Sequence, residues 1–391
     1  MLALSLGQRG LRSVLLEREL TPPGQARPEV LAQSTIETFQ SLGVGDRILK
    51  EAAIPLQRLE LHRTGDGILL HFTHEDFLRT GFQPYTTDPA RTRGILLEAA
   101  QAHGCVEVHR GVEVQDVLWD GARVVGVRAR RGMEQVIWRA PLVVGDDGGK
   151  SLIRTALGIP LTTRELPLDF LAAVGPVLPD HEEGVGQAWF NFGAIRHGIA
   201  GGVFMPLPGN RTALVFLMSP ATVAHFQQAP PAEFYATAAK FSPRCEGLER
   251  YHPFPQGFGH FRRPFGHAPR YVSDGVALMG DAAHPVTPSG GQGANASVAD
   301  ATALADIAAS AIKNKDCSAT RLATYEALRH PANSRSLLFS SRANRVMRTI
   351  RALPFLTPLL PWFISRVERS AETKERFLRF VSQAFASHPS P

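Results

Sequence analysis

The first residues show a pattern that predicts a short helix followed by a strand. Apolar side chains recur along residues 2–10, and Gly10 stands where a helix commonly ends in the left-handed conformation. The apolar run at residues 13–17 then predicts a short strand of a parallel sheet. A helix that begins at Met1 has no capping residue for its first N–H groups, so we expect a further segment in front of it.

Two more helical patterns follow in the first hundred residues. One runs, after a turn rich in Pro and Gly, through Val30, Ile36, Phe39 and Leu42, and is expected to end at Gly43 and Gly45. Another helix is predicted at residues 91–103, where Gly104 ends it, and a strand follows at residues 106–108. This alternation of helices and short strands is typical of an α/β sheet.

The dipeptide Asp120-Gly121 predicts a hairpin. Strand-like segments at residues 112–119 and 122–130 flank it. Asp-Gly between such segments is the strongest short-range signal for a two-residue turn between antiparallel strands. A meander of strands is therefore expected to begin here.

The middle of the chain has a different, β-rich pattern. From about residue 167 to residue 265, segments with strand-like alternation are separated by Pro and Gly, and the clearest are residues 187–192, 198–205 and 212–218. We therefore expect an antiparallel sheet that forms a second domain.

On either side of this region, a strand runs into an acidic loop. The apolar run at residues 142–144 leads into the Gly-Asp-Asp-Gly sequence of residues 145–148. The strand-like residues 271–279 lead into a Gly-rich loop and a long helix at residues 294–312. The first and last thirds of the chain thus have an α/β pattern, with the β-rich region inserted between them.

The composition is that of an ordinary globular protein. Of the 391 residues, 44% are hydrophobic and 20% are charged, which is enough to bury a large core. Cys105, Cys245 and Cys317 stand alone, which excludes a disulfide framework or a C-x-x-C metal site and fits a reducing cytoplasm. No apolar run reaches the roughly 18–20 residues of a membrane span, and no signal-peptide pattern opens the chain, so a soluble cytoplasmic protein is expected.

The positive charge is concentrated at the carboxyl end. The chain has a net charge of +6, and residues 331–391 alone carry ten Lys or Arg against three Glu. Because no nucleic-acid-binding motif accompanies this tail, nucleic acid is not expected as a partner. The tail also contains Leu, Phe and Trp, so it either packs back on the body as helices or makes peripheral contact with an anionic membrane surface.

Residues 280–295 carry the most informative chemistry. Here a strand leads into Gly280-Asp281, a loop stiffened by Pro, and glycines that open a helix. Such glycines let the backbone approach a ligand closely, and the free N–H groups of a helix start face negative charge. An aspartate after a strand accepts hydrogen bonds from sugar or polyol hydroxyls. A tight loop before a well-capped helix is an equally good explanation of the glycines alone.

These segments resemble a known family, the class A, single-component FAD-dependent aromatic hydroxylases, or p-hydroxybenzoate hydroxylase-like flavoprotein monooxygenases. Three matches carry the resemblance: Gly280-Asp281-Ala282-Ala283-His284 with Pro288 and Gly290-Gly291-Gln292-Gly293 matches the GD motif of the family, Asp147-Gly148 with Ser151 and Arg154 matches its DG motif, and Val14-Leu15-Leu16-Glu17-Arg18 matches the end of its first βαβ unit. The similarity covers residues 2 to about 330.

The resemblance implies an α/β fold with a Rossmann-like FAD-binding domain, built from a mostly parallel sheet with helices, an inserted antiparallel β-sheet substrate domain and a C-terminal helical tail. The implied FAD-binding domain comprises residues 1–60, 91–160 and 269–330, the substrate domain residues 61–90 and 161–268, and the helical region residues 331–391.

The resemblance also implies roles for individual residues. Glu17 would bind the adenosine ribose, and Asp281 would hydrogen-bond to the ribityl or pyrophosphate region of FAD. Pro288 would lie against the isoalloxazine ring, near the position that reacts with O2. A group of backbone N–H groups would face the flavin N1/O2 edge and stabilise negative charge on the reduced ring, namely those of Gly290, Gly291, Gln292, Gly293, Ala294 and Asn295.

Three arginines can be interpreted either as cofactor contacts or as surface charges. Arg27 resembles the flavin-contacting arginine of the family, and reads equally well as a solvated charge at the start of a helix. Arg91 and Arg93 lie near the place where a family residue approaches the pyrophosphate, and one of the two is expected at the surface. We assign Arg93 to the cofactor site.

The remaining matches concern two loops. Asp147 and Gly148 belong to a motif that the family uses for both FAD and NAD(P)H, while Arg154 is expected to brace that loop through an ion pair. His284 would act as a general base or would support the GD loop.

One part of the family pattern is absent. The first strand and its G-x-G-x-x-G loop, which hold the dinucleotide pyrophosphate, do not occur before residues 2–10. A chain that starts at Met1 would therefore lack the central strand of the FAD sheet, bind FAD weakly and leave an open sheet edge. A start assigned too late, a truncated piece of the protein, or a flavin-free relative would explain the difference.

The resemblance implies monooxygenase chemistry. NAD(P)H would reduce FAD, O2 would form a flavin C4a-hydroperoxide, and one oxygen atom would hydroxylate or epoxidise a small apolar or aromatic substrate. Two alternatives stay open: a FAD-dependent reductase or dehydrogenase similar to geranylgeranyl reductase, and a truncated, non-catalytic binding protein. A flavin halogenase is disfavoured because the chain has no W-x-W-x-I-P segment.

The central strands indicate the character of the substrate. Trp189, Phe190, Phe192, Phe204 and Met205 alternate along two of them. We read most of them as core residues, and together they favour an apolar or aromatic substrate over a sugar or a nucleotide.

Overall fold

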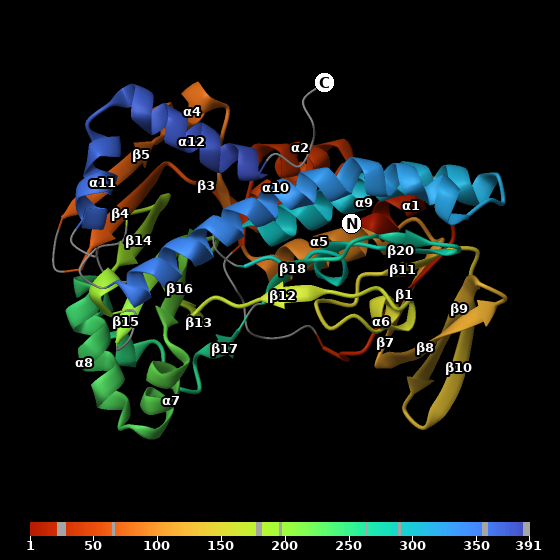
Figure 1. The fold of residues 1–391 in the computed structure, drawn as a ribbon, viewed down its shortest axis with the longest axis horizontal. Helices are drawn as coiled ribbons and strands as arrows, with labels where there is room; N and C mark the ends of the chain where they lie inside the picture. The colour runs from red at the N-terminus through yellow and green to blue at the C-terminus, as the bar shows by residue number, and fades with distance from the viewer. Residues whose placement is uncertain are drawn as a thin grey trace.

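The computed structural model describes residues 1–21, 29–64, 67–176, 182–194, 198–262, 264–287, 291–353 and 359–385. A seven-stranded sheet with its helices stands at one end of the molecule and several smaller sheets stand at the other (Figure 1). The long helix α10 (Ala319–Ala352) runs between these two ends (Figure 1).

The N-terminal region confirms the predicted order of helix and strand. Helix α1 (Leu2–Gln8) leads into β1 (Ser13–Glu17), which pairs in parallel with β7 (Val106–Arg110). Helix α5 (Pro89–Gln101) precedes β7, and Asp88 caps it by accepting hydrogen bonds from two N–H groups of its first turn.

Strand β1 has an open side. Of the described strands, only β7 pairs with β1, and β11 (Val143–Gly145) pairs only with β20 (Val276–Leu278). Val14 and Leu15 are 43% and 42% exposed, although both faces of a strand in a parallel sheet are normally covered. The described part of the chain thus agrees with the expectation of an open sheet edge.

The helix expected to begin near Val30 is shorter than predicted. Val30 lies in β2 (Glu29–Leu31), which pairs with β6 (Tyr85–Thr87), and β6 also pairs with β3 (Ala53–Pro55). Helix α2 spans Gln33–Ser41, and Gly45 opens a further helix, α3 (Gly45–Glu51). The prediction was wrong at Val30 because a three-residue strand cannot be told from a helix by apolar spacing alone.

The predicted hairpin is confirmed. Strands β8 (Val112–Asp120) and β9 (Arg123–Arg131) pair in antiparallel register around the Asp120-Gly121 turn, and β10 (Glu134–Arg139) continues the meander.

The strand predicted at residues 271–279 is broken into two. β19 (Val272–Ser273) and β20 are joined by a tight turn, and Gly275 in this turn has φ +76°. The turn docks on β9, because the Val124 N–H donates to the Asp274 carbonyl at 2.9 Å. A side chain at Gly275 would collide with the carbonyl group of Val124, so the tertiary contact explains the glycine.

The β-rich insertion forms the seven-stranded sheet. Its order is β17-β13-β16-β15-β14-β4-β5, and neighbours are antiparallel except β14 and β4. The strands are β4 (Arg58–Arg63), β5 (Ile68–Thr73), β13 (Asp169–Pro176), β14 (Val185–Phe190), β15 (Ile199–Leu207), β16 (Arg211–Met218) and β17 (Gly259–Phe261). The sheet is therefore mainly antiparallel, as predicted, and its one parallel pair is where β4 joins it; β5 comes from residues 61–90, which were expected to contribute to the substrate domain.

Helices cover both faces of this sheet. On one face lie α7 (Pro220–Gln228) and α8 (Pro231–Phe241), and on the other lie α4 (His74–Thr80), the end of α10, α11 (Leu359–Glu368) and α12 (Ala371–Phe385) (Figure 1). The predicted packing of tail helices on the body is confirmed by Ile350, Ile364 and Leu378.

The aromatic residues of the central strands divide between these faces. Trp189 and Phe204 are 4% and 1% exposed beneath α7 and α8, whereas Met205 packs on the opposite face. Because neighbouring residues of a strand point to opposite faces, Phe204 and Met205 cannot line the same pocket. The interpretation of the five residues as mainly core is confirmed for Trp189 and Phe204, while the Phe192 side chain lies outside the described part of the chain.

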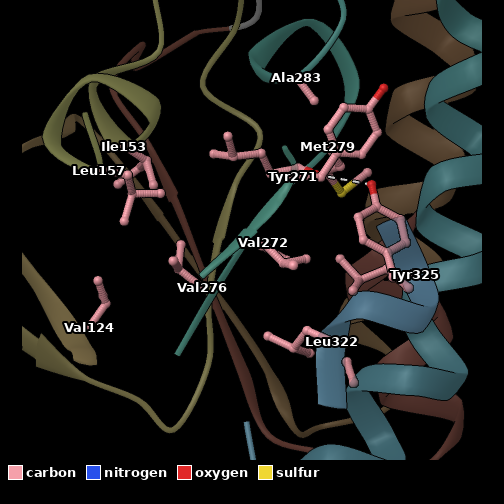
Figure 2. Close-up of a cluster of buried hydrophobic side chains, with 14 of the residues drawn as sticks. Val124, Ile153, Leu157, Tyr271, Val272, Val276, Met279, Ala283, Leu322 and Tyr325 are labelled. Carbon is pink, nitrogen blue, oxygen red and sulfur yellow. Dashed lines mark hydrogen bonds between the residues drawn. The ribbon is translucent and has the colours of Figure 1, made fainter. Parts of the chain in front are cut away.

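The remaining elements connect the two ends of the molecule. These are α6 (Leu152–Ala156), the antiparallel pair β12 (Thr162–Arg164) and β18 (Phe265–His267), and α9 (Gln292–Lys313). The core between β20, α9 and α10 includes Tyr271, Tyr325 and Leu322 (Figure 2), and the Tyr325 hydroxyl donates to the Leu278 carbonyl at 3.0 Å. Within the described residues, no helix is both long enough and apolar enough to cross a membrane.

Phe216 provides a test of the packing between the large sheet and α8. Its ring is fully buried and lies 5.8 Å from Phe234 and 6.3 Å from Phe241, centroid to centroid. We expect Phe216→Ala to lower the free energy of unfolding by about 3–5 kcal/mol, because it leaves a cavity. Urea unfolding measures the change, with Met133→Ala, at a residue 99% exposed, as the control. Equal stability of the two variants would contradict this packing.

Candidate functional site

Two parallel strands carry acidic residues to one edge of their sheet. Asp146 and Asp147 follow β11, and Asp281 follows β20. Burial raises the pKa of Asp146 to about 7, with further contributions from the negative charges of Asp300, Asp281 and Asp147 and an opposing one from the Met1 ammonium group. Asp146 and Asp147 nevertheless keep solvent-exposed surface. Because ligands of α/β sheets bind at the carboxyl ends of the strands, we expect the ligand crevice of this sheet beside these exposed carboxylates.

Asp147 organises the loop after β11. Its carboxylate accepts hydrogen bonds from the Ser151 hydroxyl at 2.5 Å and from the Leu152 N–H at 2.7 Å, and so caps α6. Gly148 lies in the same loop, with open space where a side chain would begin. Arg154 braces the loop as expected, but through carbonyl oxygens: its guanidinium donates to Ala282 at 2.7 Å and to Gly149 at 2.9 Å. Arg154 thereby joins the loop after β11, which carries the DG motif, to the loop after β20, which carries the GD motif and is called the GD loop below.

The charges of Arg93 and Asp281, which are 188 positions apart in the sequence, both act on Glu29. Burial raises the pKa of Glu29 to about 7, the positive charge of Arg93 opposes this shift, and the negative charges of Asp281 and Asp88 reinforce it. The charges of Glu29, Arg93 and Asp281 come from β2, α5 and the loop after β20. This corner combines one cation with several carboxylates.

The neighbouring Arg91 faces a different part of the surface. Its guanidinium forms an ion pair with Glu51 of α3 and lies 3.6 Å from Glu98 of its own helix. Of the two arginines, Arg93 is therefore the one that the structure directs to the corner with Asp281.

The start of α9 is pinned to β2 and α2. Asn295 accepts hydrogen bonds from the Ala32 N–H at 2.9 Å and the Thr35 hydroxyl at 2.6 Å, and it donates to the Val30 carbonyl at 2.8 Å. Gly291 is the N-cap with φ +64°, and a side chain there would press on Val30. The Asn295 side chain is thus occupied by structural contacts.

The N-cap residue of α9 is Gly291, and no side chain of the described residues is hydrogen-bonded as its cap, so the first turn is a source of backbone donors. The N–H groups at the start of a helix have no partner within the helix, and the helix dipole gives them partial positive charge. Gly291, Gln292, Gly293 and Ala294 supply these groups here. Such a turn can bind a polar or anionic edge of a ligand.

Asp300 links the GD loop to two helices. The residue is fully buried on α9, and its carboxylate accepts hydrogen bonds from the Gly280 N–H at 3.0 Å, the Arg329 guanidinium at 2.7 Å and the Asn333 amide at 3.1 Å. His284 is its fourth partner, with 2.5 Å between Nε2 and the carboxylate oxygen. Despite its burial, the charges and hydrogen bonds of His284 and Arg329 hold the pKa of Asp300 well below its usual range.

His284 is enclosed by this network. It is 2% exposed, and the nitrogen that a general base would use faces Asp300. Behind it, Tyr271 is hydrogen-bonded to His267, whose ring stacks on His330 of α10 at 4.0 Å between centroids. Burial, together with the charges of His330 and His284, lowers the pKa of His267 to about 4, so His267 is neutral near pH 7.

Glu17 is on a different sheet from the two strands that lead to Asp147 and Asp281. It ends β1, and its carboxylate is exposed and accepts a hydrogen bond from the Glu19 N–H at 2.8 Å. Arg27, Pro288 and Gly290 lie outside the described residues.

The described residues are chemically suited to part of a flavin dinucleotide. Asp281 offers acceptors for the hydroxyls of a ribityl chain, and the first turn of α9 offers donors to an anionic ring edge. Glu17 stands at the end of a parallel strand, where ribose hydroxyls are commonly bound. The sequence contains no G-x-G-x-x-G segment for the pyrophosphate. The described residues are therefore suited to bind the ribityl chain, the flavin edge and the ribose of FAD.

Sequence reasoning did not assign a role to Asp300, Arg329 or Asn333. One signal was available, because Asp300 stands in a stretch of α9 that is otherwise rich in Ala, Val and Leu. A charged residue on the apolar face of a helix needs a buried partner. The identity of that partner, 29 positions away, is not written in any local pattern.

Asp300 gives a test of this network. We expect Asp300→Asn to lower the free energy of unfolding by about 3–5 kcal/mol, because it leaves the Arg329 charge buried without its carboxylate. Because the pKa of Asp300 is lowered in the folded state, its ionised carboxylate contributes its full stabilisation above the unfolded-state pKa of about 4. This stabilisation is lost as the pH falls towards the folded-state pKa.

The difference in free energy of unfolding between the wild type and Asp300→Asn should therefore become smaller below about pH 4, as measured by urea unfolding. Asp306→Asn on the same helix, where the carboxylate is 73% exposed, is the matched control and should change stability by about 0.5 kcal/mol or less. A stability difference that is small at neutral pH, or that becomes larger in acid, would show that Asp300 does not stabilise the fold through this network.

Comparisons with known proteins agree with this geometry. Residues 1–340 match the model of a family described as FAD binding domain. The chain is 26% identical over 321 residues to the 3-demethoxyubiquinol 3-hydroxylase of Escherichia coli, which covers 78% of this chain and 75% of that protein. It is also 26% identical over 399 residues to the ubiquinone hydroxylase UbiL of Rhodospirillum rubrum, covering 100% of this chain and 88% of that protein.

Solved structures show the same fold. The structure of HpxO from Klebsiella pneumoniae, complexed with FAD and uric acid, matches with a TM-score of 0.79 at 21% identity over 99% of this chain and 95% of that chain. PqsL from Pseudomonas aeruginosa, described as a probable FAD-dependent monooxygenase, matches with a TM-score of 0.75 at 22% identity over 88% of this chain and 92% of that chain. The chain thus belongs to the FAD-binding-domain family, and within it to the FAD-dependent monooxygenases.

Proposed function

We propose that this chain uses NAD(P)H and O2 to hydroxylate an electron-rich aromatic ring such as a phenol or a hydroquinone. The observation that carries the proposal is the position of β2: the charges of Arg93 and Asp281 both act on its Glu29, and the start of α9 is held against its Val30. The names of the two curated relatives support the substrate class, because both refer to hydroxylation of ubiquinol-type or ubiquinone-type compounds.

In this proposal, the chain binds FAD through contacts spread over three segments. Asp281 accepts hydrogen bonds from the ribityl chain, and Glu17 accepts them from the adenosine ribose. Arg93 offers its positive charge to the pyrophosphate, while Asp147 and Gly148 border the same crevice. When bound, FAD supplies the redox chemistry that takes electrons from NAD(P)H and activates O2.

The first turn of α9 would stabilise negative charge on the reduced flavin. The N–H groups of Gly291, Gln292, Gly293 and Ala294 provide preorganised donors, and Gly290 would extend the row. Asn295 would serve by holding this turn against β2. Pro288 would pack against the flavin ring and limit access of water to it.

We propose that His284 is a positioning residue rather than a general base. Its imidazole, together with Asp300 and Arg329, fixes the GD loop that carries Asp281. An enclosed histidine with its Nε2 directed at a buried carboxylate is not placed to take a proton from a substrate.

The substrate is proposed to lie on the sheet face that α10 covers. Val203 and Leu217 are partly exposed there, in contrast to the residues beneath α7 and α8. Thr287 at the end of the GD loop donates a hydrogen bond to Ser340 of α10 at 3.1 Å, and Ile350 of α10 packs near Leu217. This helix therefore connects the loop with an apolar face that suits an aromatic ring.

FAD binding tests the role of Asp281. We expect Asp281→Ala to raise the dissociation constant of FAD by about 10–100-fold, since hydrogen bonds to a charged group contribute about 1.5–3 kcal/mol each. Quenching of FAD fluorescence measures the constant. Asp120→Ala, in the exposed turn between β8 and β9, removes the same charge elsewhere and should leave the constant unchanged. Equal effects of the two substitutions would exclude Asp281 from the cofactor site.

Oxygen labelling tests the reaction itself. The chain with FAD and NAD(P)H is incubated with phenols and hydroquinones under oxygen-18 gas, and products are analysed by mass spectrometry. We expect one labelled oxygen atom in the product, because a monooxygenase takes its oxygen from O2 and not from water. Oxidation of NAD(P)H that yields a reduced, unlabelled product would show a reductase of the same fold instead.

A further inference from the structure

Helix α11 has two apolar faces, and the described residues pack against one of them. Ile364 and Val367 pack on the cluster beneath β5. Leu359, Trp362 and Phe363 are 49%, 49% and 58% exposed, and their spacing of three and four residues places them on one other face of the helix. Scattered exposed apolar residues are ordinary, but three large ones on one helical face indicate a binding surface.

The second half of α10 continues this surface with positive charge. Leu338, Val346 and Leu353 are 54%, 47% and 42% exposed, at positions that share one face with the exposed Arg342 and Arg345. Residues 335–352 contain five arginines and no Asp or Glu. The end of α10 and helix α11 stand at the same end of the molecule (Figure 1). We refer to the exposed faces of these two segments as the basic aromatic surface.

The charge of this surface is largely uncompensated. Arg335, Arg345 and Arg348 form no ion pair with a carboxylate of the described residues. Two other arginines lie over aromatic rings: Arg366 is 5.0 Å from the centroid of Trp362, and Arg342 is 5.4 Å from that of Phe380. Elsewhere in the protein, exposed arginines such as Arg128 and Arg130 have carboxylate partners at 2.6 and 2.7 Å.

We propose that the basic aromatic surface binds the surface of a bilayer that contains anionic lipid. Charge complementarity selects this partner, because anionic headgroups attract clustered arginines that have no internal counter-ion. Trp and Phe beside them suit the interfacial layer, where an aromatic ring buries apolar area while its polar edge stays hydrated. The helices would lie in the plane of the interface, in keeping with the finding that no described helix can span a membrane.

This binding is independent of the proposed reaction. It requires only the folded chain, and the sheet face proposed for the substrate lies beneath the same helix α10. A chain that docks through α10 and α11 would stand at the interface, where poorly water-soluble aromatic compounds collect. The surface therefore places the protein near a supply of apolar substrate, whichever ring it acts on.

Vesicle flotation with the whole chain tests the proposal. Vesicles of phosphatidylcholine alone are compared with vesicles that contain about 30% phosphatidylglycerol, at about 100 mM and about 500 mM salt. We expect the chain to float with the anionic vesicles at low salt, and at least tenfold less of it to float with neutral vesicles or at high salt. Equal flotation with neutral vesicles, or none with anionic ones, would overturn the proposal.

Two paired substitutions locate the contact. Trp362→Gln with Phe363→Gln, and Arg345→Gln with Arg348→Gln, are each expected to reduce binding to anionic vesicles about tenfold or more. Met133→Gln with Ile137→Gln removes residues 99% and 57% exposed on the β8–β10 meander, and it should leave binding unchanged. Thermal unfolding checks that all variants fold. If the meander variant loses as much binding as the others, the surface is not the contact.

Sedimentation velocity without vesicles separates a bilayer from a second copy of the chain. The proposal requires that Trp362→Gln with Phe363→Gln does not change the sedimentation coefficient. A wild type that dimerises, and a variant that is monomeric, would show that this face joins two copies and would overturn the proposal.

Discussion

The buried carboxylate of Asp300 is the interaction on which the arrangement of the site depends. A charged group without partners in the interior is far too costly to persist, so Asp300 requires the Arg329 guanidinium and the hydrogen bonds of Gly280 and His284. Gly280 and His284 come from the GD loop, and Arg329 comes from α10, whereas Asp300 itself is on α9. The position of the GD loop, the direction of α9 and the docking of α10 therefore depend on one another. If one of them shifted, a buried charge would lose its partner or become exposed.

This dependence extends from the crevice to the large sheet. Helix α10 holds Asp300 through Arg329, holds the GD loop through Ser340, and packs Ile350 on the sheet face. Arg154 adds a second brace between the two loops that border the crevice. Ligand groups can be positioned accurately at loops only when rigid elements support them. The same helix also presents its outer side to solvent, so the site and the basic aromatic surface are two faces of one structural element.

Local patterns predicted much of the fold correctly. The helix before β1, the hairpin at Asp120-Gly121 and the start of α9 follow from turn residues and apolar spacing, which act over a few residues. The predictions failed where a distant contact decided the outcome. Val30 joined a strand because β6 is its partner, and the strand predicted at residues 271–279 broke at Gly275 because its turn docks on β9.

The sequence by itself determined the alternation of elements, the motif residues that carry the family resemblance, and the concentration of positive charge at the carboxyl end. Only the tertiary structure decided that Arg93 lies near Glu29 while Arg91 pairs with Glu51, that Asn295 is occupied by structural contacts, and that Asp300 has Arg329 as its partner. The physical reason is the distance along the chain over which each interaction acts. Propensity and capping act between neighbours in the chain, whereas charge pairing and burial act between neighbours in space, which exist only once the chain has folded.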